Sequence, residues 1–266
     1  MPELKSFDRV AHCYDETRGM PPAVTGQIAD AITDALGETA GHPRLLEVGI
    51  GTGRMAVPLA ERGVNVTGLD IAPRMLAILR GKRRDIGAVL AESSRPPFRQ
   101  AAFDAALFVH ILHLVPDAES TVRATVPLVH ARGWVIRGQE ERPDGALDQI
   151  LGDILQRTAR ETLGIELQGE AHHARTNATF ERVLADGGWA LRRDVVARWE
   201  RPTTARQVLD GLRRRENSGS WQIPEAGMPV LLAELEGRVV TVFGGLDEVR
   251  PAEREFILTI GRRKPS

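Results

Sequence analysis

A run of alternating glycines is the first feature of the sequence that points to chemistry. It reads Glu47-Val48-Gly49-Ile50-Gly51-Thr52-Gly53, and we expect it to connect a short buried strand to a helix that begins near Arg54. Because glycine has no side chain, a ligand can approach the backbone closely at such a turn. The free N–H groups and the positive dipole end of the helix start favour a carboxylate or a phosphate. The run therefore predicts a site for a nucleotide-like ligand.

The spacing of the glycines restricts the kind of ligand. The dinucleotide fingerprint G-x-G-x-x-G requires a glycine where this chain has Arg54, and the chain lacks a recognisable Tyr-x-x-x-Lys pair. Asp70 ends the next expected strand, where its two oxygens suit the ribose hydroxyls of an adenosine group. Because that acid suits NAD or another adenosyl cofactor, an NAD(P)-dependent oxidoreductase stays an alternative.

Two histidines are candidates for a catalytic base. His110 and His113 follow the expected strand Phe103–Val109 at its carboxyl end, where open α/β sheets place their ligands. His113 also has a structural interpretation, as a side chain that packs among neighbouring leucines. His172 and His173 are adjacent and therefore point in different directions on a regular element, so we predict no metal site.

Strands and helices alternate around these residues. We expect strands at Arg44–Val48, Val64–Asp70, Ala88–Leu90, Phe103–Val109 and Trp134–Arg137, and helices at Pro21–Leu36, Arg54–Arg62, Pro73–Arg83 and Asp117–Val129. Strands that are separated by helices imply right-handed crossovers and a parallel sheet covered on both faces. The pattern predicts a doubly wound α/β fold.

The alternation changes beyond Gly138. Apolar residues at helical spacing predict helices over Leu147–Leu155, Thr176–Ala185, Thr203–Arg214 and Pro229–Phe243, and apolar runs predict strands at Leu191–Trp199 and Phe256–Ile260. The helices after Gly138 interrupt the sheet. We expect them to form a cap on the domain rather than an independent module.

The motifs together resemble a known family. Glu47 to Gly53, Asp70, Pro97-Phe98 and Phe103-Asp104 are similar to the class I S-adenosylmethionine-dependent methyltransferases, in their small-molecule, type 11-like branch, over roughly residues 7–138. The resemblance implies a Rossmann-like fold with a mostly parallel seven-stranded sheet, helices on both faces and a helical insert. It also implies an enzyme that transfers a methyl group from S-adenosyl-L-methionine to O, N or C of a small molecule by in-line displacement.

The resemblance also assigns roles to individual residues. Glu47 would orient the cofactor's amino group, and Gly49, Ile50, Gly51 and Gly53 would surround its methionine part. Asp70 would hold the ribose, Ile71 and Met75 would flank the adenine, and Glu92 with Ser93 would face its amino edge. The family more often has Asp-Ala where this chain has Glu92-Ser93.

The remaining implied contacts come from the N-terminal stretch and the fourth strand. Tyr14 and Arg18 would belong to a lid over the cofactor, and His110 would contact the cofactor as well as being a candidate base. A general base is optional in this class. We predict four parts: a helical lid (1–40), the cofactor-binding core (41–138), a helical insert or substrate cap (139–190) and a C-terminal completion of the sheet (191–266).

The composition restricts the classes of binding partner that we expect. Thirty-five basic and 36 acidic side chains give a net charge of -1, so we expect no nucleic-acid partner, and we interpret Arg213–Arg215 and Arg262–Lys264 as solvated surface. No apolar run approaches the roughly 18 residues of a bilayer crossing, so we expect no membrane partner. A lone cysteine, Cys13, and a polar start favour the cytoplasm. A homodimer and a non-catalytic protein that only binds the cofactor stay open.

Overall fold

The computed structural model contains one seven-stranded sheet and describes residues 6–37, 41–142, 145–216 and 218–263. The strands are β1 (Arg44–Val48), β2 (Asn65–Asp70), β3 (Gly87–Leu90), β4 (Phe103–Val109), β5 (Val129–Glu141), β6 (Trp189–Glu200) and β7 (Glu253–Arg263). Their order is β3-β2-β1-β4-β5-β7-β6. The five strands from β3 to β5 pair in parallel, and antiparallel strands are also present. The predicted α/β fold with a mostly parallel, doubly wound sheet is confirmed.

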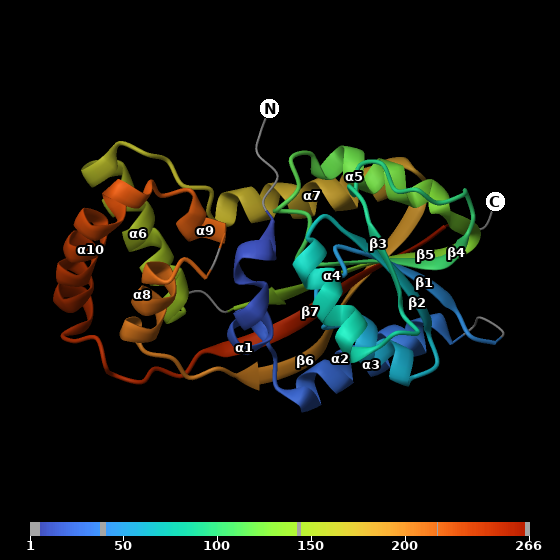
Figure 1. Ribbon diagram of the computed structural model, residues 1–266, viewed down its shortest axis with the longest axis horizontal. Coiled ribbons are helices and arrows are strands. Elements are labelled where there is room, and N and C mark those ends of the chain that lie inside the picture. The colour runs from blue at the N-terminus through green and yellow to red at the C-terminus, as the bar shows by residue number, and fades with distance from the viewer. Residues whose placement is uncertain (1–5, 38–40, 143–144, 217, 264–266) are drawn as a thin grey trace. The chain divides into compact units, whose positions relative to one another are not determined.

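Helices connect the strands. They are α1 (Tyr14–Arg18), α2 (Pro22–Leu36), α3 (Ala56–Glu61), α4 (Pro73–Lys82), α5 (Ala118–Thr125), α6 (Leu147–Leu163), α7 (Glu170–Asp186), α8 (Ala205–Arg213), α9 (Ser218–Trp221) and α10 (Met228–Phe243), with 3-10 turns η1 (Phe7–Cys13), η2 (Val126–Leu128) and η3 (Glu225–Gly227). Figure 1 shows α2 and α3 on one side of the sheet and α5 and α7 on the other. No helix in the described part of the chain combines the length and hydropathy that a bilayer crossing requires.

Local chemistry explains where several helices begin. Pro22 and Pro73 occupy the first position of α2 and α4, where a missing N–H is tolerated and the fixed φ suits a helix. Asp117 caps α5 by accepting the N–H of Ser120, and Thr204 forms a capping box with Gln207 at α8. These caps satisfy backbone donors that the first helical turn leaves open.

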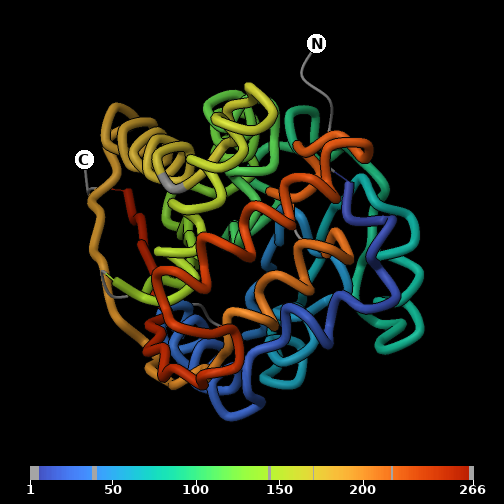
Figure 2. Tube along the Cα trace, turned by 90° about the vertical axis from the view of Figure 1, so that its left-hand side faces the viewer, coloured from blue at the N-terminus to red at the C-terminus, as the bar shows by residue number. Residues whose placement is uncertain are grey.

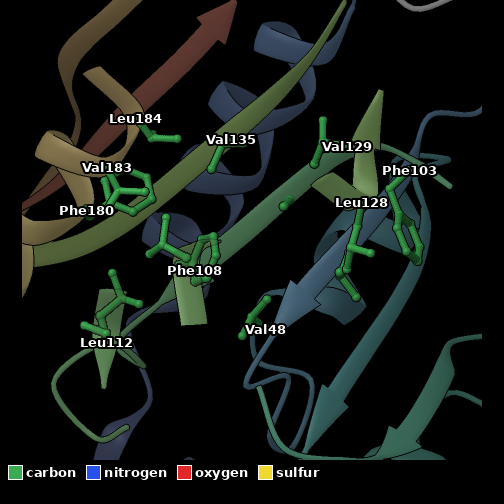
Figure 3. Close-up of a cluster of buried hydrophobic side chains, with 14 of the residues drawn as sticks. Val48, Phe103, Phe108, Leu112, Leu128, Val129, Val135, Phe180, Val183 and Leu184 are labelled. Atoms are coloured by element: carbon green, nitrogen blue, oxygen red, sulfur yellow. The ribbon is translucent and has the colours of Figure 1, made fainter. Parts of the chain in front are cut away.

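Apolar side chains fill the space between the sheet and one helical layer. All seven residues of β4 are buried, as expected of a strand that has neighbours on both edges and both faces. Figure 3 shows Phe108 of β4 beside Phe180 of α7, and their rings pack edge to face with centroids 5.8 Å apart. Val48 and Val135 contribute to the same cluster from β1 and β5. This core holds the carboxyl ends of β1, β2 and β4 in a fixed arrangement.

The chain divides into two compact units. The first, here called the sheet unit, comprises residues 1–140, 174–197 and 256–266, and the second, the helical unit, comprises residues 141–173 and 198–255. The helical unit has a hydrophobic core of its own, to which α6, α8 and α10 contribute Leu151, Leu209 and Leu235. Residues 139–190, expected as one insert, are divided between the two units.

Predicted and observed elements agree in type and order, and several extend further than predicted: α6 runs to Leu163, α7 begins at Glu170, and β7 spans Glu253–Arg263. β5 begins at Val129 rather than at Trp134: Val129 pairs with Phe103, and the three partly or fully exposed residues that follow it interrupt the apolar run before Trp134. The N-terminal stretch contains regular turns, η1 and α1, whose short length gives no periodicity to detect. The four-residue helix α9 was not predicted for the same reason.

Candidate functional site

The glycine run forms a tight turn at the carboxyl end of β1. Gly49, Gly51 and Gly53 have φ angles of 77°, 55° and 80°, which lie in the left-handed region that glycine adopts without strain. The N–H groups of Gly49 and Ile50 both donate to the carbonyl of Leu69, at 2.9 and 3.0 Å, so the turn is fixed to the end of β2. We call residues 49–53 the glycine loop.

Close packing is a second reason for these glycines. A Cβ atom on Gly49 would lie 2.7 Å from Cδ1 of Ile111, and one on Gly53 would lie 2.4 Å from Cδ1 of Leu79. A Cβ on Gly51 would meet Cε of Met75 at 3.3 Å. The loop therefore needs glycine both for its backbone angles and for its contacts with the segments around it.

Asp70 connects β2 to the glycine loop. Its Oδ2 accepts the N–H of Gly51 and its Oδ1 accepts the N–H of Ala72, both at 2.9 Å. Burial raises the pKa of Asp70, and these backbone donors oppose the rise. A carboxylate has about four lone-pair positions, so these backbone bonds leave acceptor capacity for a ligand hydroxyl.

Glu47 is a buried acid directly before the loop. Its side chain lies at the carboxyl end of β1, it is only 3% exposed, and Oε2 has no hydrogen-bond partner among the described residues. Burial raises the pKa of Glu47 to about 8; the charge of Arg54 opposes this rise and that of Asp70 adds to it. An unpartnered buried carboxyl is costly unless something binds it, so the position favours a cationic ligand group.

A pocket opens beside the loop within the sheet unit. It contains about 640 Å³ of free space, part of it open to solvent, and Asp70 is among the residues that line it. Eight residues predicted for the site line it: Tyr14, Gly49, Gly51, Asp70, Ile71, Met75, Ser93 and His110. The structure thus brings together the loop, the end of β2 and the end of β4 around one cavity.

The other predicted residues lie outside that lining. Glu47, Ile50 and Gly53 are buried in or before the loop, and Glu92 is exposed. Ser93 lines the pocket, and its Oγ lies 3.2 Å from Oγ1 of Thr121. The assignment of Glu92 and Ser93 to the adenine edge stays a prediction.

The two candidate bases differ in position. His110 lines the pocket, and its φ of 52° is unusual for a residue with a side chain. Its ring packs edge to face on Phe256, with centroids 6.0 Å apart. His113 lies in the following turn and does not line the pocket. A rare backbone angle beside a cavity is where functional residues concentrate, so His110 is the stronger candidate.

The N-terminal segment forms one wall. Phe7 and Tyr14 line the pocket, and their rings pack edge to face with centroids 5.4 Å apart. The guanidinium of Arg54 lies 5.9 Å from the Tyr14 ring and donates a 2.6 Å hydrogen bond to the carbonyl of Arg18. Arg18 therefore contributes its backbone here, and the described pocket lining does not include its side chain.

Several lining residues were not predicted. They are apolar or aromatic: Phe7, Leu69, Ala91, Val109, Ile111, Leu114 and Val115. Ile111 and its neighbours could have been predicted from the sequence, because they follow β4, and the carboxyl end of that strand was already expected to face the ligand. Phe7 gave no such signal.

The strand order and the pocket at the carboxyl ends of the central strands define a Rossmann-like fold of the class I type. Residues 46–136 match the family described as "Methyltransferase domain". The resemblance proposed from the motifs is confirmed by this match.

Two similar proteins carry methyltransferase names. The chain is 36% identical over 122 residues to demethylmenaquinone methyltransferase of Tropheryma whipplei strain Twist, covering 43% of this chain and 49% of that protein. It is 38% identical over 141 residues to a ubiquinone biosynthesis O-methyltransferase of Chromobacterium violaceum, covering 50% and 60%. The chain thus spans about half of the length of the first and somewhat more of the second.

Solved structures share the fold over more of the chain. The YcgJ protein of Bacillus subtilis aligns with a TM-score of 0.56 at 14% identity, covering 89% of this chain and 99% of that one. A Haemonchus contortus phosphoethanolamine N-methyltransferase 2, in complex with S-adenosyl-L-methionine, aligns with a TM-score of 0.53 at 13% identity, covering 97% and 57%. At these identities the likeness establishes the fold.

Proposed function

We propose that this chain is an S-adenosyl-L-methionine-dependent methyltransferase that acts on a small molecule. The observation that carries the proposal is a pocket lined by Gly49, Gly51 and Asp70 at the carboxyl ends of neighbouring strands, with the buried Glu47 directly before the glycine loop. The methyltransferase names of the relatives support the same activity.

The residues present suit this cofactor chemically. Oε2 of Glu47, buried and unpartnered among the described residues, offers an acceptor to the ammonium group of the methionine part. Asp70 retains acceptor capacity for the ribose hydroxyls. Ile71 and Met75 offer apolar surface to the adenine. The loop suits a dinucleotide less well, because the dinucleotide fingerprint requires a glycine beside the pyrophosphate where this chain has Arg54.

The protein's part in the reaction follows from these positions. The chemistry that S-adenosyl-L-methionine supplies when bound is a methyl group already activated by a sulfonium. Glu47 and Asp70 bind the cofactor and orient it. Orientation alone can lower the free-energy barrier of a well-aligned reaction by about 7–11 kcal/mol. Phe7 and Tyr14 cover one side of the pocket with aromatic surface, which reduces the access of water to the reacting groups. His110 is placed to accept a proton from a weakly acidic acceptor group at the end of β4.

The acceptor proposed is a small molecule with an apolar body. Ile111, Leu114 and Val115 line the pocket, and its described lining includes no lysine or arginine, which favours an apolar over an anionic acceptor. Quinone precursors are the first class to test, because the relatives' names mention demethylmenaquinone and ubiquinone biosynthesis. Absence of a nucleic-acid partner, a cytoplasmic location and a homodimer are further proposals; the near-zero net charge and the lone cysteine support the first two.

Two measurements test the proposal. Calorimetric titration of the full chain with S-adenosyl-L-methionine and, separately, with NAD and NADP should give micromolar binding for the first only. Incubation with labelled S-adenosyl-L-methionine and mixtures of candidate acceptors should transfer label to an apolar small molecule. Binding of NAD or NADP instead, or no binding of S-adenosyl-L-methionine at millimolar excess, would reject the proposed function. Tight binding without transfer to any acceptor would favour the non-catalytic alternative.

A further inference from the structure

Asp15 joins three segments around the glycine loop. One carboxylate oxygen accepts the hydroxyl of Thr52 at 2.6 Å, and the other accepts the ammonium of Lys82, also at 2.6 Å. Lys82 donates a further hydrogen bond to the carbonyl of Thr52 at 3.0 Å. Asp15, Thr52 and Lys82 thus form a closed ring of contacts between α1, the glycine loop and the end of α4. We call it the Asp15 ring.

Thr52, the residue of the glycine loop that Asp15 contacts, lies where it can control the shape of the proposed cofactor site. Thr52 lies between Gly51 and Gly53, both in left-handed conformations, and is only 1% exposed. Both its hydroxyl and its carbonyl are engaged by the Asp15 ring. Holding Thr52 at both groups restricts the rotation of the flanking backbone, and flexible glycines make such restriction necessary.

Independent contacts hold the same segment at its other end. Oδ1 of Asp8 accepts the N–H of Arg74 at 2.9 Å, and so satisfies a free donor at the start of α4 from 66 positions away in the sequence. Ala11 and Tyr14 pack with Met75 in a small apolar cluster. Figure 1 and Figure 2 both show the N-terminal turns beside α4. Residues 7–18 are thereby fixed along α4 and over the loop.

We infer that Asp15 is a positioning residue for the cofactor site. It acts through Thr52 on the glycine loop and through α1 on Tyr14, so one carboxylate couples the shape of the loop to the placement of the aromatic wall. A cofactor that contacts both surfaces is held in one arrangement by both of them only while this coupling is intact. This inference rests on the proposed function for the identity of the ligand, while the coupling itself is a property of the ligand-free chain.

The coupling predicts a specific kinetic effect. Because Asp15 and Lys82 are 43% and 36% exposed, solvent and salt weaken their ion pair, and the effect of its loss is modest. We expect Asp15→Ala to raise the dissociation rate of S-adenosylhomocysteine about tenfold, the size of one charged hydrogen bond at a partly exposed position, with little change in the association rate. Asp15→Asn, which keeps an acceptor for Thr52 but loses the ion pair, should fall between wild type and Asp15→Ala.

The neighbouring Glu16 provides a matched control. It lies on the same helix, is exposed, and its side chain makes no hydrogen bond or ion pair among the described residues. Glu16→Ala removes the same charge and should leave the dissociation rate unchanged. If Asp15→Ala does not fold, Lys82→Met removes the same ion pair from the other side and should raise the rate in the same direction.

Hydrogen exchange of the ligand-free chain separates this inference from the proposed function. Residues 7–18 and 49–53 should exchange faster in Asp15→Ala than in wild type or Glu16→Ala, with the strands unchanged. Equal exchange in all three proteins, or equal dissociation rates where the ligand binds, would overturn the positioning role. Failure of wild type to bind S-adenosylhomocysteine would reject the proposed function, and the exchange result would still decide whether Asp15 couples the two segments.

Discussion

The backbone N–H of Gly51 donates to the carboxylate of Asp70 at 2.9 Å, so the residue that is proposed to hold a ribose also holds the loop beside it. The same carboxylate accepts the N–H of Ala72 through its other oxygen. The glycine loop and the ribose position therefore depend on one side chain, and a change at Asp70 affects both.

Substitution of Asp70 separates these two roles. Asp70→Ala removes both acceptors, and we expect at least about a tenfold loss of S-adenosyl-L-methionine affinity together with roughly 1–3 kcal/mol of stability, since two buried N–H groups lose their partner. Asp70→Asn keeps one acceptor and should lose affinity with a smaller loss of stability. Calorimetric titration and urea unfolding measure the two effects. A titration curve for Asp70→Asn that matches wild type would exclude the ribose contact.

Glu47 makes stability depend on pH in a predictable direction. Its pKa is raised from 4.5 to about 8 in the native state, so the native state holds this proton more tightly than the unfolded chain does. The stabilising contribution is complete below pH 4.5 and is lost as the pH rises through about 8. Glu47→Gln is neutral throughout, so above pH 8 it should melt at a higher temperature than wild type, and below pH 4.5 at a similar one. A constant difference across this range would contradict the assignment.

The same residue predicts proton release on binding. At neutral pH most Glu47 carboxyls are protonated in the free protein, because burial raises their pKa to about 8. An ammonium group of the ligand favours the ionised form, so binding should expel a proton. Calorimetry in buffers of different ionisation enthalpy measures this release. The release should disappear in Glu47→Gln, whose affinity should also fall.

The two histidines should differ in their effect on turnover. We expect His110→Asn to lower kcat by about 10² or more if His110 is the base, and to remove a limb of the pH–rate profile. Asparagine is chosen because it tolerates the left-handed backbone better than most residues, so the substitution tests chemistry rather than strain. His113→Gln should leave kcat close to wild type, since His113 does not line the pocket. Unchanged turnover in His110→Asn would show that the reaction needs no base at this position.

A pair of glycine substitutions tests the conformation of the loop. Gly53→Ala places a side chain at φ 80° and within 2.4 Å of Leu79, and should destabilise the protein by about 1–3 kcal/mol. Gly237→Ala, in the middle of α10 with open space around it, should stabilise by about 0.5–1 kcal/mol. Urea unfolding measures both. A neutral Gly53→Ala would mean that the loop is free to rearrange.

Local features of the sequence were sufficient to predict most of the fold and part of the candidate site. The glycine run and Asp70 lie in short segments whose composition dictates a strand, a turn and a helix, so their convergence follows from the order of parallel strands. Asp8 and Asp15 contact residues 66 and 37 positions away, and no pattern in a short polar stretch signals such partners. The apolar wall formed by Phe7 was missed for that reason. Two separate stretches of the chain build the helical unit, so no single run of the sequence marks it as a unit.

The helical unit is built from two separate stretches of the chain, and this affects both its folding during synthesis and the design of hybrid proteins. Leu151 of α6 finds its apolar neighbours on α8 and α10, which are translated only after α7 and β6. The emerging α6 therefore stays without its partners while the ribosome completes the intervening strand, a stage at which exposed apolar surface favours aggregation. Any hybrid with a relative must exchange residues 141–173 and 198–255 as a pair, because either piece alone carries half of a core.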